Sequence, residues 1–259
     1  GAVQLTSTTG SNKCPICGKS NGIHSAGEKA QRIAGGVVIN PPHKYPWLVY
    51  IQSVIEGFSY SCGGQIINSR WVLTAAHCFY DGRDSGCNYI EEAEVHVGLH
   101  QSDFRDKKFL TGVTRIIQVK DFVEHQGFQC GISHDDDIGL LGLEEELDLF
   151  SIKQSEGIKA ICLPKDDEGW FEGDQAVAAG WGATASKRSE STQKTMKVPQ
   201  DVPSEVNIPI KRELCSTYKA SWITDNMLCA GNHRKSKDAC SGDSGGPLAV
   251  KNKNDTYVL

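Results

Sequence analysis

The chain has 259 residues, of which 39% are hydrophobic and 23% are charged, so it carries enough apolar material for a core and is not wholly disordered. Its 27 basic and 32 acidic residues give a net charge of −5, and no basic excess favours nucleic acid or an anionic membrane as a partner. No apolar run reaches the roughly 18 residues of a membrane-spanning helix, so no membrane span is expected.

The amino-acid composition of the chain changes near Arg32. Residues 1–31 are polar and lack periodicity, which indicates a tail or pro-segment rather than a domain. From Arg32 onward, short β-rich runs alternate with Gly, Pro, Asn and Asp, a pattern typical of an all-β barrel or sandwich. The predicted strands are residues 47–52, 71–74, 94–98, 113–119, 138–143, 175–179, 206–210 and 247–250, with a helix at 211–214, a helical turn at 75–78 and a surface loop at 187–200.

Ten cysteines are many for a cytosolic chain and typical of a secreted one, so the expected location is extracellular. The chain starts with Gly1 and has no signal-type apolar stretch, as in a secreted protein after signal removal or a recombinant chain. Cys14 and Cys17 have the C-x-x-C spacing of metal and redox sites. Such sites need a second ligand pair or a βαβ setting, and neither accompanies them, so we expect no metal and no cofactor.

The clearest catalytic candidate is Ser244, in the run Gly-Asp-Ser-Gly-Gly-Pro from Gly242 to Pro247. Small neighbours leave the hydroxyl open, and the backbone of a tight loop can direct N–H groups at a developing oxyanion. An ordinary Gly/Ser turn is the alternative. A serine becomes a good nucleophile only with a base in reach and an acid that orients the base.

His77 and Asp137 are the candidate base and acid. A bridge between Cys78 and Cys62, 16 residues upstream, would clamp the turn that carries His77. Asp137 leads directly into an apolar run, so it can be buried at the start of a strand, where an orienting carboxylate belongs. Taken singly, a histidine is more often structural or solvated, and an acidic run is usually a solvated face.

Together these segments resemble the chymotrypsin/trypsin family of serine proteases. The order His77, Asp137, Ser244 is that of the family and differs from subtilisins and α/β-hydrolases. The resemblance covers residues 33–259, with Ala34 where Val is usual and Gly139 where Ala is usual. Its motifs are Ile-Ala-Gly-Gly at 33–36, Trp-Val-Leu-Thr-Ala-Ala-His-Cys at 71–78, Ala-Gly-Trp-Gly at 179–182, Met-Leu-Cys-Ala-Gly at 227–231 and the serine motif.

The resemblance implies a role for each matching residue. Ser244 would attack the peptide carbonyl, His77 would transfer the proton, and Asp137 would hold the imidazole tautomer, with the N–H groups of Gly242 and Ser244 as the oxyanion hole. Asp238 would form the floor of the specificity pocket and select Arg or Lys. The Arg32–Ile33 bond would be the activation site, and the new amine of Ile33 would pair with Asp243.

The resemblance also implies disulfides Cys62–Cys78 and Cys215–Cys229, and a tether from Cys162 to Cys17 or Cys14, with Cys17 preferred. We further expect Cys87 to pair with Cys130, because they flank the cleft-side loops, and find no partner for Cys240. Leu99 follows Gly98 where calcium-binding trypsins carry glutamate, so calcium is not expected. Asn254 stands in an N-x-T sequon and is a candidate glycosylation site.

The predicted fold is all-β, with two packed antiparallel six-stranded barrels of the trypsin type. Residues 1–32 form a pro-segment or tethered light chain, and residues 33–259 form the protease domain. We expect a secreted serine endopeptidase made as a zymogen, whose partners are Arg/Lys-containing substrates, an activating trypsin-like protease and protein inhibitors. The alternatives are a non-catalytic homologue that acts as a binding or cofactor protein, and a disulfide-stapled structural module.

The resemblance also concerns the end of the chain. Residues 256–259 are apolar and predict the opening of a strand. Family members continue through further strands and a helix, which supply a pocket wall and a partner for Cys240. We therefore expect the second barrel to be incomplete, the chain to be a fragment or a truncated isoform, and its activity to be poor even after cleavage at Ile33.

Overall fold

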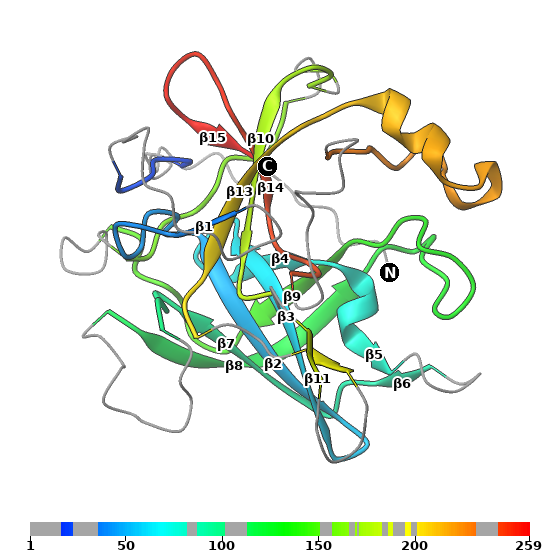
Figure 1. Ribbon diagram of the computed structural model, residues 1–259. Helices are drawn as coiled ribbons and strands as arrows, with labels where there is room; N and C mark the ends of the chain where they lie inside the picture. The colour runs from blue at the N-terminus through cyan, green and yellow to red at the C-terminus, as the bar shows by residue number, and fades with distance from the viewer. Residues whose placement is uncertain are drawn as a thin grey trace.

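The computed structural model of the protein is built mostly from strands, with three short 3-10 helices among the residues that it describes (Figure 1). This confirms the predicted all-β class. None of the described helices is both long and apolar enough to cross a membrane. The structure describes residues 17–22, 36–81, 87–101, 113–150, 157–165, 169, 171–182, 186–188, 195–197, 201–231 and 243–259.

Six antiparallel strands close into the first barrel, which lies in the lower half of Figure 1. Apolar side chains such as Val49, Ile51, Val72, Val95 and Leu141 fill its core and are at most 3% exposed. Because the sheet closes on itself, each strand has a hydrogen-bonded neighbour on both sides and no free edge remains, while side chains alternate between the packed interior and the outside. The strands, in barrel order, are β2 (Leu48–Ile55), β3 (Phe58–Ile66), β4 (Trp71–Thr74), β9 (Gly139–Leu143), β8 (Arg115–Glu124) and β7 (Glu92–Val97).

A second antiparallel sheet lies above this barrel in Figure 1. Within the described residues it is an open sheet of five strands, so a closed six-stranded barrel is seen only in the first half of the molecule. Its strands, in sheet order, are β1 (Val37–Val38), β13 (Ser204–Pro209), β10 (Gln175–Gly180), β14 (Leu248–Lys251) and β15 (Tyr257–Val258).

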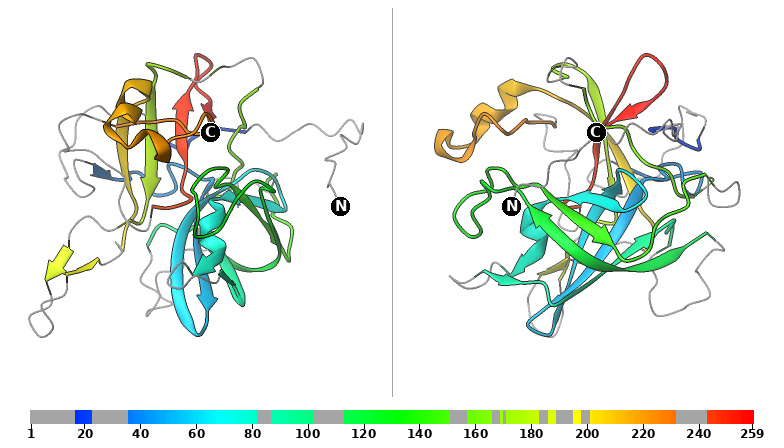
Figure 2. Two further views of the ribbon diagram at one scale, coloured as in Figure 1. Left: turned by 90° about the vertical axis from the view of Figure 1, so that its right-hand side faces the viewer. Right: turned by 180° about the vertical axis from the view of Figure 1, so that it is seen from behind.

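Buried aromatic side chains join the second sheet to the barrel. Trp47 packs against Tyr257 with ring centroids 5.4 Å apart, and Tyr50 meets the edge of Trp181 at 5.8 Å. Large aromatic side chains bury much apolar area and favour tilted or edge-on contacts of this kind. The first barrel and the second sheet therefore share one core, and Figure 2 shows them stacked in both views.

Most predicted strands are present with shifted ends, several strands were not predicted, and the predicted loop at 187–200 is wrong in part. Strand β3 was not expected, because its run contains Ser61, Gly63 and Gly64, which are poor strand formers. Part of the expected loop at 187–200 forms the hairpin of β11 (Ser186–Arg188) and β12 (Thr195–Lys197), which projects from the body of the molecule in Figure 2, left. Backbone pairing can hold two strands together whatever the polarity of their side chains.

The predicted helical segments are 3-10 turns. They are η1 (Ala76–Phe79), directly after β4, and η3 (Arg212–Thr217), which is followed by η4 (Ala220–Trp222). The short pair β5 (Tyr80–Asp81) and β6 (Asn88–Tyr89) follows η1. A short helical turn suffices at η1 because the disulfide and the flanking strands already fix its ends.

Candidate active site

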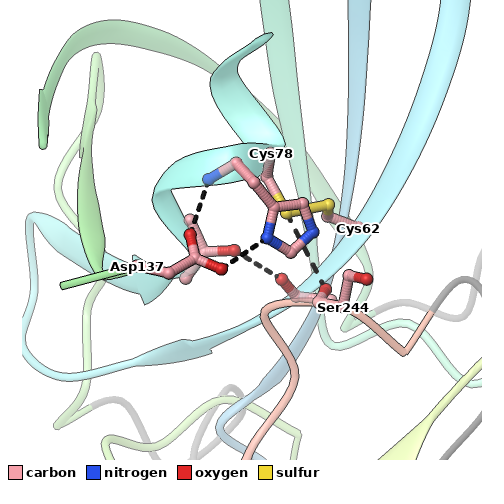
Figure 3. Close-up of a disulfide and its surroundings, with 7 residues drawn as sticks. Cys62, Cys78, Asp137 and Ser244 are labelled. Atoms are coloured by element: carbon pink, nitrogen blue, oxygen red, sulfur yellow. Dashed lines mark hydrogen bonds and ion pairs between the residues drawn. A yellow bond between two sulfur atoms is a disulfide. The ribbon is translucent and has the colours of Figure 1, made fainter. Parts of the chain in front are cut away.

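Strand pairing brings His77 and Asp137 together. Strands β4 and β9 are antiparallel neighbours, and Thr74 lies opposite Gly139. The residues that follow Thr74 therefore run beside the residues that precede Gly139. The backbone N–H of His77 donates to Asp137 Oδ1 at 2.8 Å, and His77 Nδ1 lies 2.7 Å from Asp137 Oδ2. Figure 3 shows Asp137 and Ser244 gathered beside the Cys62–Cys78 disulfide.

The charge of Asp137 decides the tautomer of His77. Burial by itself raises the pKa of Asp137, but the hydrogen bonds from His77 and the nearby charges of His77 and His134 outweigh it and lower the pKa. An ionised carboxylate only accepts hydrogen bonds. Nδ1 of His77 therefore carries the proton, and Nε2 keeps the lone pair that a general base needs.

The Cys62–Cys78 disulfide joins β3 to η1 beside this pair. The loop of Ser244 lies against the same place, because the N–H of Gly63 donates to the carbonyl of Ser244 at 2.7 Å. Cys78 Sγ is 3.9 Å from that carbonyl oxygen (Figure 3). A disulfide sulfur has no proton to donate, so this is a packing contact. The histidine turn and the serine loop are thus fixed to one strand.

Glycines allow the serine loop to approach β3 closely. Gly245 has φ +75°, which disfavours other residues, and a Cβ there would overlap Thr74. A Cβ on Gly63 would lie 2.9 Å from the Cα of Gly246. Thr74 Oγ1 donates to the carbonyl of Gly63 at 2.8 Å and fills the remaining space. Sequence reasoning gave Thr74 and Gly63 no role, although both are in or next to motifs that it identified.

The carboxylate of Asp243 faces the Ala-Gly-Trp-Gly segment. Gly182 donates its N–H to Asp243 Oδ1 at 2.8 Å. A Cβ on Gly180 or Gly182 would overlap the Asp243 carboxyl group, so both positions need glycine. Asp243 is therefore held against the 180–182 segment, whereas the backbone of the neighbouring Ser244 lies against β3, which the Cys62–Cys78 disulfide joins to the turn of His77.

Hydrogen bonds connect the segment before Asp137 to the second half of the molecule. Thr224 Oγ1 donates to Asp135 Oδ1 at 2.6 Å, and Asn226 Nδ2 donates to Asp135 and Asp136 at 3.2 and 3.0 Å. The hydrogen bond from Thr224 is the main reason that the pKa of Asp135 lies below its usual value. A cavity of about 720 Å³ opens here, lined by His134, Asp137, Asn226, Gly246 and others.

A second cavity, of about 480 Å³, lies elsewhere. Its walls come from η3 and the segment that follows η4, including Cys215, Thr224 and Leu228, and none of its lining residues belongs to the predicted triad. The cavity of about 720 Å³ is lined by Asp137 and is therefore the one that adjoins the predicted triad.

The structure joins the four cysteine pairs of the sequence analysis. They are Cys17–Cys162, Cys62–Cys78, Cys87–Cys130 and Cys215–Cys229, with Cα atoms 5.0 to 6.3 Å apart. These separations lie in the usual range for disulfides. Asn254 is exposed in the turn between β14 and β15. Several predicted residues lie outside the described residues, namely Cys14, Arg32, Ile33, Asp238, Cys240 and Gly242.

Comparisons with known proteins agree with this geometry. The family model described as Trypsin matches residues 22–258. The chain is 32% identical to transmembrane protease serine 5 of Homo sapiens over 95% of this chain and 47% of the relative. It is 30% identical to urokinase-type plasminogen activator of Gallus gallus, over 80% and 45%, and 33% identical to clotting factor G beta subunit of Tachypleus tridentatus, over 85% and 66%.

The chain thus spans between 45% and 66% of the length of these relatives. The matched region includes the barrel, the second sheet and the His77–Asp137 pair beside the Ser244 loop. The chain belongs to the trypsin family of serine proteases.

Proposed function

We propose that the chain is a serine endopeptidase in which Ser244, His77 and Asp137 act as a catalytic triad. The observation that carries the proposal is the 2.7 Å contact between His77 Nδ1 and Asp137 Oδ2, beside the loop of Ser244. It leaves the lone pair of Nε2 available, and a neutral imidazole with that lone pair can remove a hydroxyl proton.

The reaction follows from these roles. Oγ of Ser244 attacks the peptide carbonyl carbon, and its proton passes to His77 Nε2. Backbone N–H groups of Gly242 and Ser244 stabilise the oxyanion. The C–N bond then breaks, and the leaving amine takes the proton from His77. Water, deprotonated by His77, hydrolyses the acyl-enzyme and regenerates Ser244.

Activation is proposed to follow cleavage of the Arg32–Ile33 bond, with the new amine of Ile33 pairing with Asp243. Strands β1 and β10 flank the same two residues of β13, which puts the start of β1 two strand spacings, about 10 Å, from the end of β10. Asp243 binds Gly182 just beyond the end of β10, and this end of the second sheet is where we propose that the amine of Ile33 inserts.

For specificity, we propose that Asp238 selects substrates with Arg or Lys before the scissile bond. A buried carboxylate is stable only with a cation or other strong partner, and the side chain of such a substrate supplies one. Protein inhibitors and an activating trypsin-like protease are the further expected partners. Secretion is proposed on the four disulfides, which form and persist in oxidising compartments.

The test is covalent labelling of Ser244 by a fluorophosphonate before and after cleavage with trypsin. We expect labelling only after cleavage, none in Ser244→Ala, and none in trypsin-treated Arg32→Gln. Because Cys17 is bonded to Cys162, the pro-segment should separate from the catalytic chain only on a reducing gel. A cleaved, folded chain that takes no label, not even at the low stoichiometry expected of a poorly active chain, would refute catalysis and support a non-catalytic, binding role.

A substrate series tests Asp238. Asp238→Ser should cost roughly 3–5 kcal/mol for Arg substrates, as when one partner of a buried ion pair is removed. Labelling by a small uncharged fluorophosphonate should change much less. Full turnover of Arg substrates by this variant would contradict the assignment.

A further inference from the structure

A third side chain, His134, lies beside the His77–Asp137 pair. The rings of His77 and His134 have centroids 6.1 Å apart and are nearly perpendicular. One potential ligand atom from each of His77, His134 and Asp137 lies within 4.8 Å of the other two. The proposed mechanism gives His134 no role.

The loop holds His134 in this place from both sides. Cys130, four residues earlier, is bonded to Cys87. Asp135, the next residue, accepts hydrogen bonds from Thr224 and Asn226. His134 itself is exposed and borders the cavity of about 720 Å³. Its backbone is therefore anchored, and its ring is free to rotate toward solvent or toward His77.

This arrangement matches the chemistry of a transition-metal ligand set. Zinc binds histidine nitrogen at about 2.0–2.1 Å, so two donors of one tetrahedral ion lie roughly 3.3 Å apart. The three donors need to close by at most about 1.5 Å from the 4.8 Å limit, which rotation of an exposed ring can supply. Hard cations such as Ca²⁺ and Mg²⁺ prefer oxygen ligands and fit this set poorly.

A second group of potential ligands, Cys62, His77 and Cys78, is not available. Its two sulfurs form a disulfide, and only a thiolate is a good metal ligand. Among the described residues, the set of His77, His134 and Asp137 is therefore the one with three usable donors.

We propose that His77, His134 and Asp137 bind a divalent transition-metal ion of the zinc class, and that the ion reversibly inhibits the enzyme. A metal on Nε2 of His77 occupies the lone pair that must accept the proton of Ser244. A metal on Nδ1 instead displaces the hydrogen bond to Asp137. Either way base catalysis stops. The inhibitory part of this inference rests on the proposed function, whereas the binding part does not.

The test compares the wild-type chain, His134→Gln and a matched control, His125→Gln, after cleavage at Arg32–Ile33. His125 is an exposed histidine of the same segment that contacts Asp136 and lies outside the donor set. The rate of fluorophosphonate labelling is measured in buffered free Zn²⁺, and each variant is compared with its own metal-free rate. Calorimetry with Ser244→Ala measures zinc binding without any catalysis.

We expect Zn²⁺ to slow labelling of the wild type, EDTA to restore it, and the same concentration of Mg²⁺ to have no effect. His134→Gln should need at least about tenfold more Zn²⁺ for the same slowing of labelling, because losing a ligand weakens metal affinity at least as much as losing the contacts that support a ligand. His125→Gln should behave like the wild type. Calorimetry should show one zinc site in Ser244→Ala that the added His134→Gln change weakens.

The two proposals fail in different ways. Labelling that proceeds at the same rate with and without Zn²⁺ would overturn the metal site and leave the protease function intact. A zinc response lost in His125→Gln but kept in folded His134→Gln, as checked by its thermal midpoint, would overturn the ligand set. A chain that never labels but shows the calorimetric site would support the metal site and refute the protease function.

Discussion

At the scale of single residues, the contact between His77 and Asp137 sets both the position and the tautomer of His77, the proposed base. Asp137 holds the ring through Nδ1 and also accepts the backbone N–H of His77, so one carboxylate orients the side chain and its turn together. Its lowered pKa means that it stays ionised at neutral pH and below, and keeps the proton on Nδ1. An amide side chain at this position would no longer favour the His77 tautomer with the proton on Nδ1.

Asp137→Asn should therefore keep the fold and lose activity. An asparagine can donate from its nitrogen, which stabilises the tautomer with the proton on Nε2 and removes the lone pair that the reaction needs. The expected loss in kcat is roughly 10⁴-fold, the size established for this change in the serine protease template. Hydrolysis of a small Arg substrate measures it. Asp121→Asn, an exposed change on β8, is the control, and equal activity of the two variants would contradict the role of Asp137.

Gly182→Ala tests the position of Asp243. The new Cβ would overlap the carboxyl group of Asp243, which must move and lose the 2.8 Å hydrogen bond from Gly182. Because Ser244 is the next residue, the labelling rate after activation should fall by at least tenfold, which corresponds to about 1.4 kcal/mol. Gly57→Ala is the control: a Cβ there meets no atom within 4 Å, and the strain from its φ of +73° is confined to the turn between β2 and β3, so it lowers stability rather than the labelling rate. An unchanged labelling rate in Gly182→Ala would show that Asp243 does not need this position.

At the scale of elements, residues 80–89, which follow η1, and residues 128–130, which follow β8, form one aromatic and disulfide-linked wall. Tyr80 packs at a tilt against Tyr89, with ring centroids 4.6 Å apart, and against Phe128 at 5.7 Å. The Cys87–Cys130 disulfide joins the same two segments. The wall leads directly into the His134–Asp137 segment, so its stiffness determines how well the acid and the neighbouring histidine are placed.

Removing this disulfide should cost more stability than removing Cys215–Cys229. The two bridges close segments of 43 and 14 residues, and in the chain-entropy account the longer loop stabilises by about 1 kcal/mol more. The paired serine variants, Cys87→Ser/Cys130→Ser and Cys215→Ser/Cys229→Ser, are compared by urea unfolding. Equal or reversed losses would show that native contacts, rather than loop closure, set the contribution of these bridges.

At the scale of the whole molecule, buried polar contacts connect segments that are far apart in sequence. Lys44 Nζ lies 2.6 and 2.9 Å from the two oxygens of Glu205, and both side chains are 9% exposed. This pair fastens the segment after β1 to β13. The Cys17–Cys162 bridge fastens the beginning of the chain, and the N–H of Tyr257 donates to Gly18. Because contacts such as the Lys44–Glu205 pair are buried and involve titratable groups, the stability of the molecule depends on the protonation of groups in its interior.

Three histidines, His43, His96 and His100, have their pKa lowered mainly by burial, and for His100 the charge of His43 adds to this. Glu94 opposes the shift at His96 without reversing it. The unfolded chain therefore binds more protons than the folded chain below the ordinary histidine pKa of 6.5. The contribution of these neutral histidines to the free energy of unfolding is fully present above pH 6.5 and is lost as the pH falls below it.

The free energy of unfolding should accordingly fall between pH 6.5 and 5, with a slope of up to about 1.4 kcal/mol per pH unit for each histidine that stays neutral when folded. His100→Gln should reduce the slope. The lowered pKa of Asp137 has a separate effect, because its contribution is present above the ordinary value of 3.8 and is lost only at more acid pH. A stability that is constant from pH 5 to 7 would contradict the burial of these histidines.

Much of the fold and the candidate site can be predicted from local sequence. Residues 71–74 form β4 as predicted, because Trp-Val-Leu-Thr has high strand propensity and a buried position. The chemistry of His77, Asp137 and Ser244 is also local, since each stands in a motif whose small or apolar neighbours are explained by its task. Three of the cysteine pairs follow by resemblance to the family, and the pairing of Cys87 with Cys130 follows from their positions beside the cleft-side loops.

Only the tertiary structure decided the features that depend on distant neighbours. Strand β3 contains Gly63 because the serine loop at Gly246 must approach it, a contact that no window around Gly63 reveals. The same holds for the pairing of Lys44 with Glu205 and for the place of His134 beside His77. Local propensity and pattern determine what a segment can form, whereas long-range packing determines which segments meet. The sequence therefore determined the family and its reactive groups, and the packing of the first barrel against the second sheet decided the geometry around them.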